Sequence, residues 1–114
     1  MSADCLFCKI VAGTIPAKVL FEDGWCVAFP DVHPQAPVHV LVVPKDNLVS
    51  LAASDREHTA LLGRLMSEAA EVARMQGLEK GYRVVINTGS DGGQTVGHLH
   101  LHVLGGRHMG WPPG

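Results

Sequence analysis

The chain has 114 residues, 46% of them hydrophobic, and a formal net charge of −2. This length suits one domain spanning 1–114, and no apolar run approaches the roughly 20 residues that cross a membrane. The nine lysine and arginine residues are scattered, so nothing predicts a nucleic-acid partner. The first residues lack a basic segment followed by a long apolar one, so we expect no signal peptide, no membrane association and a cytoplasmic location.

Cysteine spacing gives the first motif. Cys5 and Cys8 form a C-x-x-C pair, and Cys26 is the third cysteine. Such a pair fits a redox couple, half of a zinc site or a coincidence. No βαβ pattern surrounds it, which weakens the redox interpretation. The odd count argues against a disulfide framework, and a zinc site would need two further ligands from the seven histidines.

The first half of the chain predicts a short helix and three strands. Residues 6–12 fit a short helix that ends near a glycine. Strands are expected at 19–21 and 25–29, joined by a turn that contains Asp-Gly, a strong hairpin signal. The stretch 30–37 holds three prolines and should be a stiff, irregular connection to a third strand at 38–43.

The second half predicts one long helix and two more strands. Ser54 and Glu57 have capping-box spacing, and apolar residues then recur at helical intervals over about 55–76. A fourth strand is expected at 82–87 and a fifth at 98–103. We therefore expect an α+β fold of about five mostly antiparallel strands with one long helix and a short N-terminal helix.

The fifth expected strand carries the most informative pattern. Three histidines alternate with apolar residues over 98–103. As a strand, this segment would direct Leu99, Leu101 and Val103 into the core and all three imidazoles to the opposite face. One histidine on a polar face is usually an ordinary polar residue, whereas three together favour a catalytic or metal site.

Two kinds of chemistry compete for these histidines. A His-x-His pair on a strand can present two ligands to zinc. Alternatively, a neutral imidazole can attack phosphorus and form a labile phosphoryl-imidazole. The preceding loop, 88–97, is rich in glycine, and Gly93, Gln94 and Thr95 could supply amide and hydroxyl donors to an anion. These donors favour the nucleophilic interpretation. No Asp or Glu lies in the histidine strand, which argues against a metal site with mixed carboxylate ligands there.

Two polar residues near the third strand leave alternatives open. Asp31 could be a turn residue or a carboxylate at the edge of a site. His39 shares its strand face with apolar residues, and a single such histidine is more often structural than a ligand. The cysteine pair upstream makes His39 a candidate zinc ligand as well.

The histidine stretch and its surroundings resemble a known family. Residues 94–103 are similar to the histidine-triad signature, H-φ-H-φ-H-φ-φ with φ apolar. Residues 31–39, 89–106 and 111–114 resemble the histidine-triad nucleotide-binding (Hint) branch, and the similarity runs from Phe7 to the C-terminus. The resemblance implies a homodimer that hydrolyses, or transfers from, nucleoside 5′-phosphoramidates and related compounds.

The resemblance also implies residue roles. His100 would be the nucleophile that forms a nucleotidyl-histidine, His102 would contact the phosphate oxygens, and His98 would orient the site. Gln94, Thr95 and the backbone of Gly93 would bind the α-phosphate. An apolar slot for the purine would be formed by Phe7, Ile10, Ile15 and Phe29. Asp31 would hold the ribose hydroxyls, with Val32 beside it, and Asn87 would lie near the phosphate. Trp111, in the C-terminal tail, would reach towards the partner's site.

Family members with a C-x-x-C near the N-terminus bind a structural zinc ion, and no organic cofactor is implied. The implied zinc ligands are Cys5, Cys8, His39 and His98. The expected function is cleavage of the P–N bond of purine nucleoside 5′-phosphoramidates, such as AMP–amines. The alternatives are a dinucleoside polyphosphate hydrolase and a zinc-stabilised nucleotide-binding regulatory module with little catalysis.

Two positions depart from the Hint pattern. Gly97 stands where these proteins often carry a large aromatic residue, and Pro30 stands where they often carry a polar one. Both departures could alter the preference for the leaving group or the base.

Overall fold

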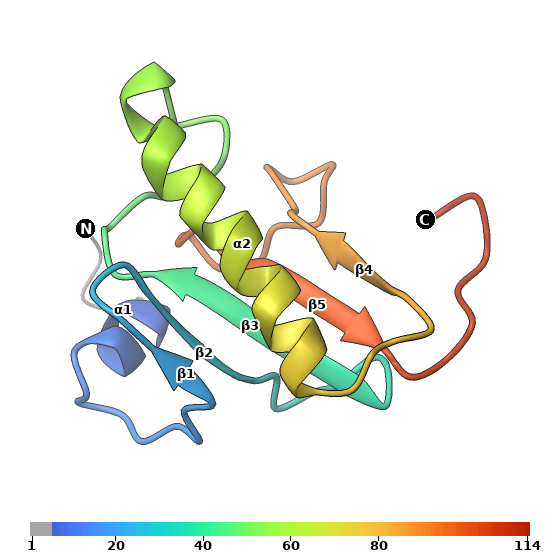
Figure 1. The fold of residues 1–114 in the computed structure, drawn as a ribbon. Helices are drawn as coiled ribbons and strands as arrows, with labels where there is room; N and C mark the ends of the chain where they lie inside the picture. The colour runs from blue at the N-terminus through green and yellow to red at the C-terminus, as the bar shows by residue number, and fades with distance from the viewer. Residues whose placement is uncertain (1–5) are drawn as a thin grey trace.

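The computed structural model describes residues 6–114, so Cys5 lies outside the described residues. Its five strands form one antiparallel sheet in the order β1-β2-β3-β5-β4 (Figure 1). This confirms the expected α+β fold. No helix within 6–114 combines the length and apolarity needed to cross a membrane. The elements are α1 (Leu6–Val11), β1 (Phe21–Glu22), β2 (Cys26–Pro30), β3 (Val38–Pro44), a 3₁₀ turn η1 (Arg56–His58), α2 (Thr59–Met75), β4 (Tyr82–Val85) and β5 (Leu101–Gly105).

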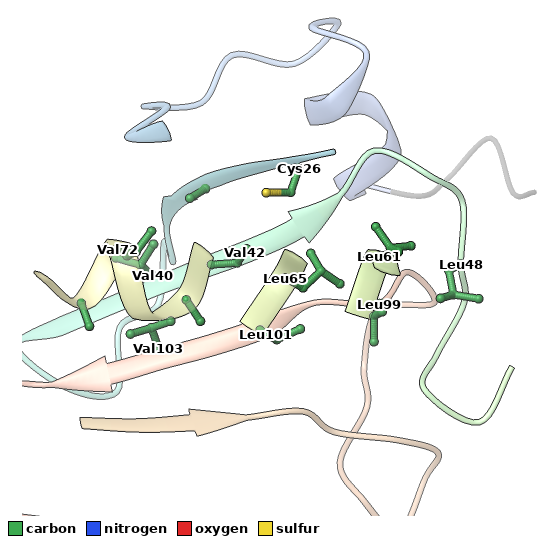
Figure 2. Close-up of a cluster of buried hydrophobic side chains, with 13 residues drawn as sticks. Cys26, Val40, Val42, Leu48, Leu61, Leu65, Val72, Leu99, Leu101 and Val103 are labelled. Carbon is green, nitrogen blue, oxygen red and sulfur yellow. The ribbon is translucent and has the colours of Figure 1, made fainter. Parts of the chain in front are cut away.

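Helix α2 covers one face of the sheet. It lies across β3 and β5, and its buried stripe includes Leu61, Leu65 and Val72 (Figure 1). Figure 2 shows these side chains meeting those of the central strands, among them Val42 and Leu101. Burial of this apolar surface is the main force that holds the helix on the sheet.

The opposite face of the sheet has a smaller apolar cluster under α1. Because successive strand residues point to opposite faces, Leu41 and Val43 of β3 point away from α2. They pack with Phe7 of α1 and with Val27 and Phe29 of β2. Strand β3 is therefore buried on both faces, which explains its almost uninterrupted apolar sequence.

The start of the long helix differs from the expected capping box. Asp55, rather than Ser54, is the N-cap, and its side chain accepts a hydrogen bond from the backbone N–H of Glu57. The backbone N–H of Asp55 donates to Nδ1 of His58, which completes the box. Ser54 instead donates to the carbonyl of Leu51. The cap therefore lies one residue later than the sequence pattern predicts, and the first turn after it is a 3₁₀ turn.

The expected strand at 98–103 begins later than predicted. Strand β5 starts at Leu101, so His98 and His100 precede it and only His102 lies within it. The register Val42↔Leu101 would next pair Leu99 with Pro44, which has no N–H to donate. The N–H of Leu99 donates instead to the carbonyl of Leu48, 2.7 Å away. The apolar side chains of this stretch are nevertheless buried against α2, as the alternation predicts.

Candidate active site

A cleft of about 530 Å³ opens on the face of the sheet opposite α2. Two of the three histidines line it, His100 and His102. Seven other predicted nucleotide contacts also line it: Phe7, Ile10, Ile15, Phe29, Asp31, Val32 and Thr95. Pro30, noted in the sequence only as a departure from the Hint pattern, lines the cleft as well. The sequence did not point to the seven other lining residues: Leu6, Pro16, Ala17, Lys18, His33, Leu41 and Val96.

Strand pairing explains one of the missed residues. Leu41 of β3 lies opposite His102 of β5 and shares its face of the sheet. Only the pairing of strands distant in sequence could have revealed this neighbour. His33 carried a weaker signal, because it lies two residues after Asp31 in the same turn.

His100 has a fixed ring orientation. Its Nδ1 lies 2.8 Å from the carbonyl oxygen of His98. A carbonyl oxygen only accepts hydrogen bonds, so Nδ1 carries a proton and donates. In the neutral ring this leaves the lone pair on Nε2, the nitrogen that remains for a substrate in the cleft. The ring of Phe7 packs edge-on against the imidazole at 4.8 Å between centroids and limits its rotation.

The tautomers of His39 and His102 follow from one backbone donor. The N–H of Gln35 donates to Nδ1 of His39 at 3.0 Å, so this Nδ1 is unprotonated. Burial, partly offset by Asp31, lowers the pKa of His39, so the ring is neutral near pH 7 and its proton lies on Nε2. That Nε2 lies 2.9 Å from Nδ1 of His102 and donates to it.

His102 therefore carries its own proton on Nε2. Burial, followed by the neighbouring His100 and His39, lowers the pKa of His102 to about 4, so this ring is also neutral near pH 7. Its Nε2 is the one fully buried side-chain nitrogen or oxygen within residues 6–114 that has no hydrogen-bond partner. A buried donor without a partner is costly, and in a cleft it is suited to an anionic oxygen of a bound ligand.

Asp31 lies beside this histidine pair. One carboxylate oxygen accepts from the N–H of His33 at 2.8 Å, and the other lies 3.4 Å from Nε2 of His39. Ligand atoms of Asp31, His39 and His102 fall within 4.8 Å of one another, close enough for a metal ion. However, the backbone N–H of Gln35 donates to Nδ1 of His39, so the proton of the His39 ring is on Nε2. Nε2 of His39 therefore donates to its neighbours and has no lone pair for a metal.

The glycine-rich loop is held by the side chain of Gln94. Its amide nitrogen donates to the carbonyls of Val49 and Val96 at 2.8 and 3.0 Å. Its oxygen accepts from the N–H of Gly89. Gln94 thus fixes the loop backbone and, unlike Thr95, does not line the cleft.

Three other predicted nucleotide contacts also lie outside the cleft lining. Gly93, with a positive φ of 81°, belongs to a turn in which its N–H donates to Ser90. Asn87 follows β4 and is partly buried. Trp111 is 83% exposed, and the guanidinium of Arg83 lies over its ring, 6.0 Å from the centroid.

The structure brings together only part of the expected zinc set. Sγ of Cys8 lies 3.1 Å from Nδ1 of His98, whose Nε2 donates to the carbonyl of Pro44. His39 is elsewhere, because five residues of extended β3 separate it from Pro44, roughly 17 Å by the rise of a strand. Both of its ring nitrogens are also engaged by other groups. His39 therefore does not join Cys8 and His98, which corrects the expected ligand set.

Comparison with known proteins agrees with the fold and the histidine cluster. The HIT domain family model matches residues 12–109, and the chain belongs to the HIT family. It is 54% identical over 114 residues to an uncharacterized HIT-like protein of Synechococcus elongatus, covering all of both chains.

Two further relatives carry more specific names. A 14 kDa zinc-binding protein of Zea mays is 50% identical, over 96% of this chain and 87% of that protein. The crystal structure of a HIT family hydrolase from Legionella pneumophila superposes with a TM-score of 0.95 at 49% identity, covering 97% of this chain and 100% of the other.

Proposed function

We propose that this protein hydrolyses purine nucleoside 5′-phosphoramidates through a nucleotidyl intermediate on His100. One observation carries the proposal: the rings of His100 and His102 lie 4.8 Å apart between centroids, and their Nε2 atoms have opposite hydrogen-bonding roles. His100 donates through Nδ1 and so offers the lone pair of Nε2. His102 offers an unpartnered buried N–H. Displacement at phosphorus requires a nucleophile and, beside it, a hydrogen-bond donor to the anionic phosphate oxygens.

The reaction takes place in two displacements at phosphorus. Nε2 of His100 attacks phosphorus, the P–N bond breaks, and the leaving nitrogen takes a proton from solvent and departs as the amine. Water then attacks the same phosphorus and releases the nucleotide, which restores His100. Overall, one water molecule adds across the P–N bond. Nε2–H of His102 stabilises the charge on the phosphate oxygens, and the loop held by Gln94 brings Thr95 to the same cleft.

The cleft favours a nucleoside as the remaining part of the substrate. Its apolar wall includes Phe7, Ile10 and Phe29, which suits a flat base. Asp31 also lines the cleft, and its carboxylate can accept hydrogen bonds from ribose hydroxyls. These features support a nucleotide rather than an isolated phosphate as the ligand.

The test is amine release from an AMP–amine phosphoramidate by the wild type and by His100→Ala. We expect the wild type to release the amine and His100→Ala to do so at least about a thousandfold more slowly. The affinity of the variant for AMP should stay within a few-fold of the wild-type affinity. His108→Ala, an exposed histidine outside the cleft, is the matched control. AMP binding without amine release would refute the enzyme and favour the regulatory module. Faster cleavage of a dinucleoside polyphosphate would favour that hydrolase instead.

A homodimer is part of this proposal. Strand β4 forms one edge of the sheet, and Tyr82 on it is 42% exposed. No other strand within 6–114 pairs with the outer side of β4, so its backbone groups there are open to a second copy. Light scattering coupled to gel filtration should give about twice the mass of one chain.

A structural zinc ion bound by the cysteine pair and His98 is also proposed. The distance between Cys8 Sγ and His98 Nδ1, 3.1 Å, and the name of the maize relative support it. Such an ion would tie α1 to the segment before β5, and the displacements at His100 do not involve it.

A further inference from the structure

The hydrogen bond between His39 and His102 has two alternative directions. If the proton of the His39 ring is on Nε2, His39 donates and Nε2 of His102 carries an N–H. If that proton is on Nδ1, His102 donates and its own Nε2 carries only a lone pair. The backbone N–H of Gln35, 3.0 Å from Nδ1 of His39, selects the first direction. The second direction would remove the N–H that the proposed reaction needs at the phosphate oxygens.

Gln35 lies in a connection that has little hydrogen bonding of its own. It belongs to 31–37, the stretch between β2 and β3, in which neither a helix nor a strand forms. Of the residues in this stretch, only Asp31 donates its N–H to a backbone carbonyl. Groups outside the stretch must therefore hold the backbone of Gln35 in place.

The turn after β5 supplies these groups. The guanidinium of Arg107 donates to the carbonyl oxygen of Gln35 through Nη2 at 3.1 Å and Nε at 3.4 Å. Its Nη1 donates to the carbonyl of His108, so all three nitrogens are held. Gly106 packs so closely on Pro37 that a Cβ on this glycine would lie 2.9 Å from Cβ of the proline. Because a charged donor forms a stronger hydrogen bond than a neutral one, Arg107 is a firm anchor for Gln35.

We infer that Arg107 is a positioning residue for the proposed reaction and that it controls the proton of His102. The connection consists of three successive hydrogen bonds, from Arg107 to Gln35, from Gln35 to His39 and from His39 to His102. The inference rests on the proposed function and adds a residue that does not line the cleft. Asp31, 3.4 Å from Nε2 of His39, favours the same proton position, so loss of Arg107 should give a mixture of tautomers rather than a complete reversal.

Long-range ¹H–¹⁵N spectra of the ligand-free protein near neutral pH measure the tautomer of His102 without any substrate. Arg107→Met keeps most of the side-chain length and removes the donors. We expect the share of His102 with its proton on Nδ1 to rise at least about tenfold. The kcat for amine release should fall at least about fivefold, with KM within about twofold. Arg74→Met, at an exposed arginine of α2, is the matched control and should change neither measurement.

Two further variants isolate the step through Gln35. Gln35→Pro removes the backbone N–H and keeps the carbonyl that accepts from Arg107. It should give the same mixture of tautomers, and adding Arg107→Met to it should change the mixture no further, because both changes act through one donor. Arg83 donates to the carbonyl of Gly110, farther along the same tail. Arg83→Met should therefore keep a single tautomer.

The outcomes separate this inference from the proposed function. A single Nε2–H tautomer of His102 in Arg107→Met would overturn the inference, whatever the activity of the variant. The same mixture in Arg83→Met would also overturn it, because any loosening of the tail would then be sufficient. Should Arg107→Met fail to fold, a single tautomer in Gln35→Pro would have the same meaning. If the wild type releases no amine but Arg107→Met still mixes the tautomers, the control of His102 stands and the proposed function is wrong.

Discussion

Nε2 of His39 lies 2.9 Å from Nδ1 of His102, although 63 residues separate the two histidines in sequence. Because the backbone N–H of Gln35 occupies Nδ1 of His39, the direction of this hydrogen bond is fixed. His102 must then present its own N–H to the cleft. A single backbone donor in the loop between β2 and β3 thus sets which ring nitrogen of His102 carries the proton.

The first prediction concerns this positioning role of His39. His39→Phe keeps the ring but removes the donor to His102, which can then adopt either neutral tautomer. We expect kcat to fall at least about tenfold with a smaller change in KM. Long-range ¹H–¹⁵N spectra should show a single Nε2–H tautomer for His102 in wild type and a mixture in the variant. His108→Phe should alter neither measurement; an unchanged His102 spectrum in His39→Phe would remove the role assigned to His39.

The second prediction concerns stability at acid pH. The pKa of His102 falls from 6.5 to about 4 on folding, and the pKa of His39 is also lowered. Between pH 6.5 and about 4, the unfolded chain therefore binds more protons than the folded one, so the free energy of unfolding decreases as pH falls through this window. Above 6.5 the rings are neutral in both states and contribute no slope.

Urea denaturation of the zinc-free protein at pH 7, 6, 5 and 4 would measure this slope. Replacing His102 with Gln should reduce the proton uptake on unfolding near pH 5 by about one. The same slope in wild type and His102→Gln would show that another group is responsible.

The third prediction separates two glycines of the loop before the histidines. A Cβ on Gly92 would lie 2.3 Å from the carbonyl oxygen of Thr88, whereas a Cβ on Gly97 would meet nothing within 4 Å. Gly92→Ala must therefore distort the loop that carries Thr95, and we expect it to lower kcat/KM at least about tenfold. Gly97→Ala is the matched control and should retain activity within about threefold. Equal activities of the two variants would mean that loop geometry does not limit turnover.

The fourth prediction concerns Cys26. Its side chain is completely buried, and burial, reinforced by Asp23, raises the pKa of its thiol to about 12. Since the thiolate is the reactive form, iodoacetamide at pH 8 should not alkylate Cys26 in the folded protein and should do so in urea. Peptide mass mapping identifies the modified position. Rapid labelling of native Cys26 would show that the α2 face of the sheet opens under these conditions.

The sequence was sufficient for the elements and their order. The short apolar run of β3 and the helical spacing of apolar residues in α2 predicted them, because burial on both faces of a strand leaves a continuous apolar run and burial of one helix face leaves a period. The start of the long helix and the start of β5 differ from the predicted positions because of hydrogen bonding. Asp55 replaced Ser54 as the cap, and β5 began late because Pro44 could not donate to Leu99.

The candidate site was predictable only in part. The pattern of alternating histidines pointed to a site, and nine of the predicted contacts line one cleft. His39 lies apart from the other expected zinc ligands, and Gln94 does not line the cleft. The partners of both side chains lie far away in sequence. Residue type and spacing do not reveal which distant backbone group reaches a given ring or amide.

The sequence by itself determined the family and the α+β architecture and pointed to the three histidines of 98–102 as the candidate site, because local periodicity and the histidine motif are properties of neighbouring residues in the chain. The tertiary structure alone decided the tautomers: Gln35, His98 and Pro44 each provide a backbone group to one ring nitrogen of a histidine. It also brought Asn47 to Cys8. A hydrogen bond acts over about 3 Å, so these partners exist only after strands distant in sequence have paired.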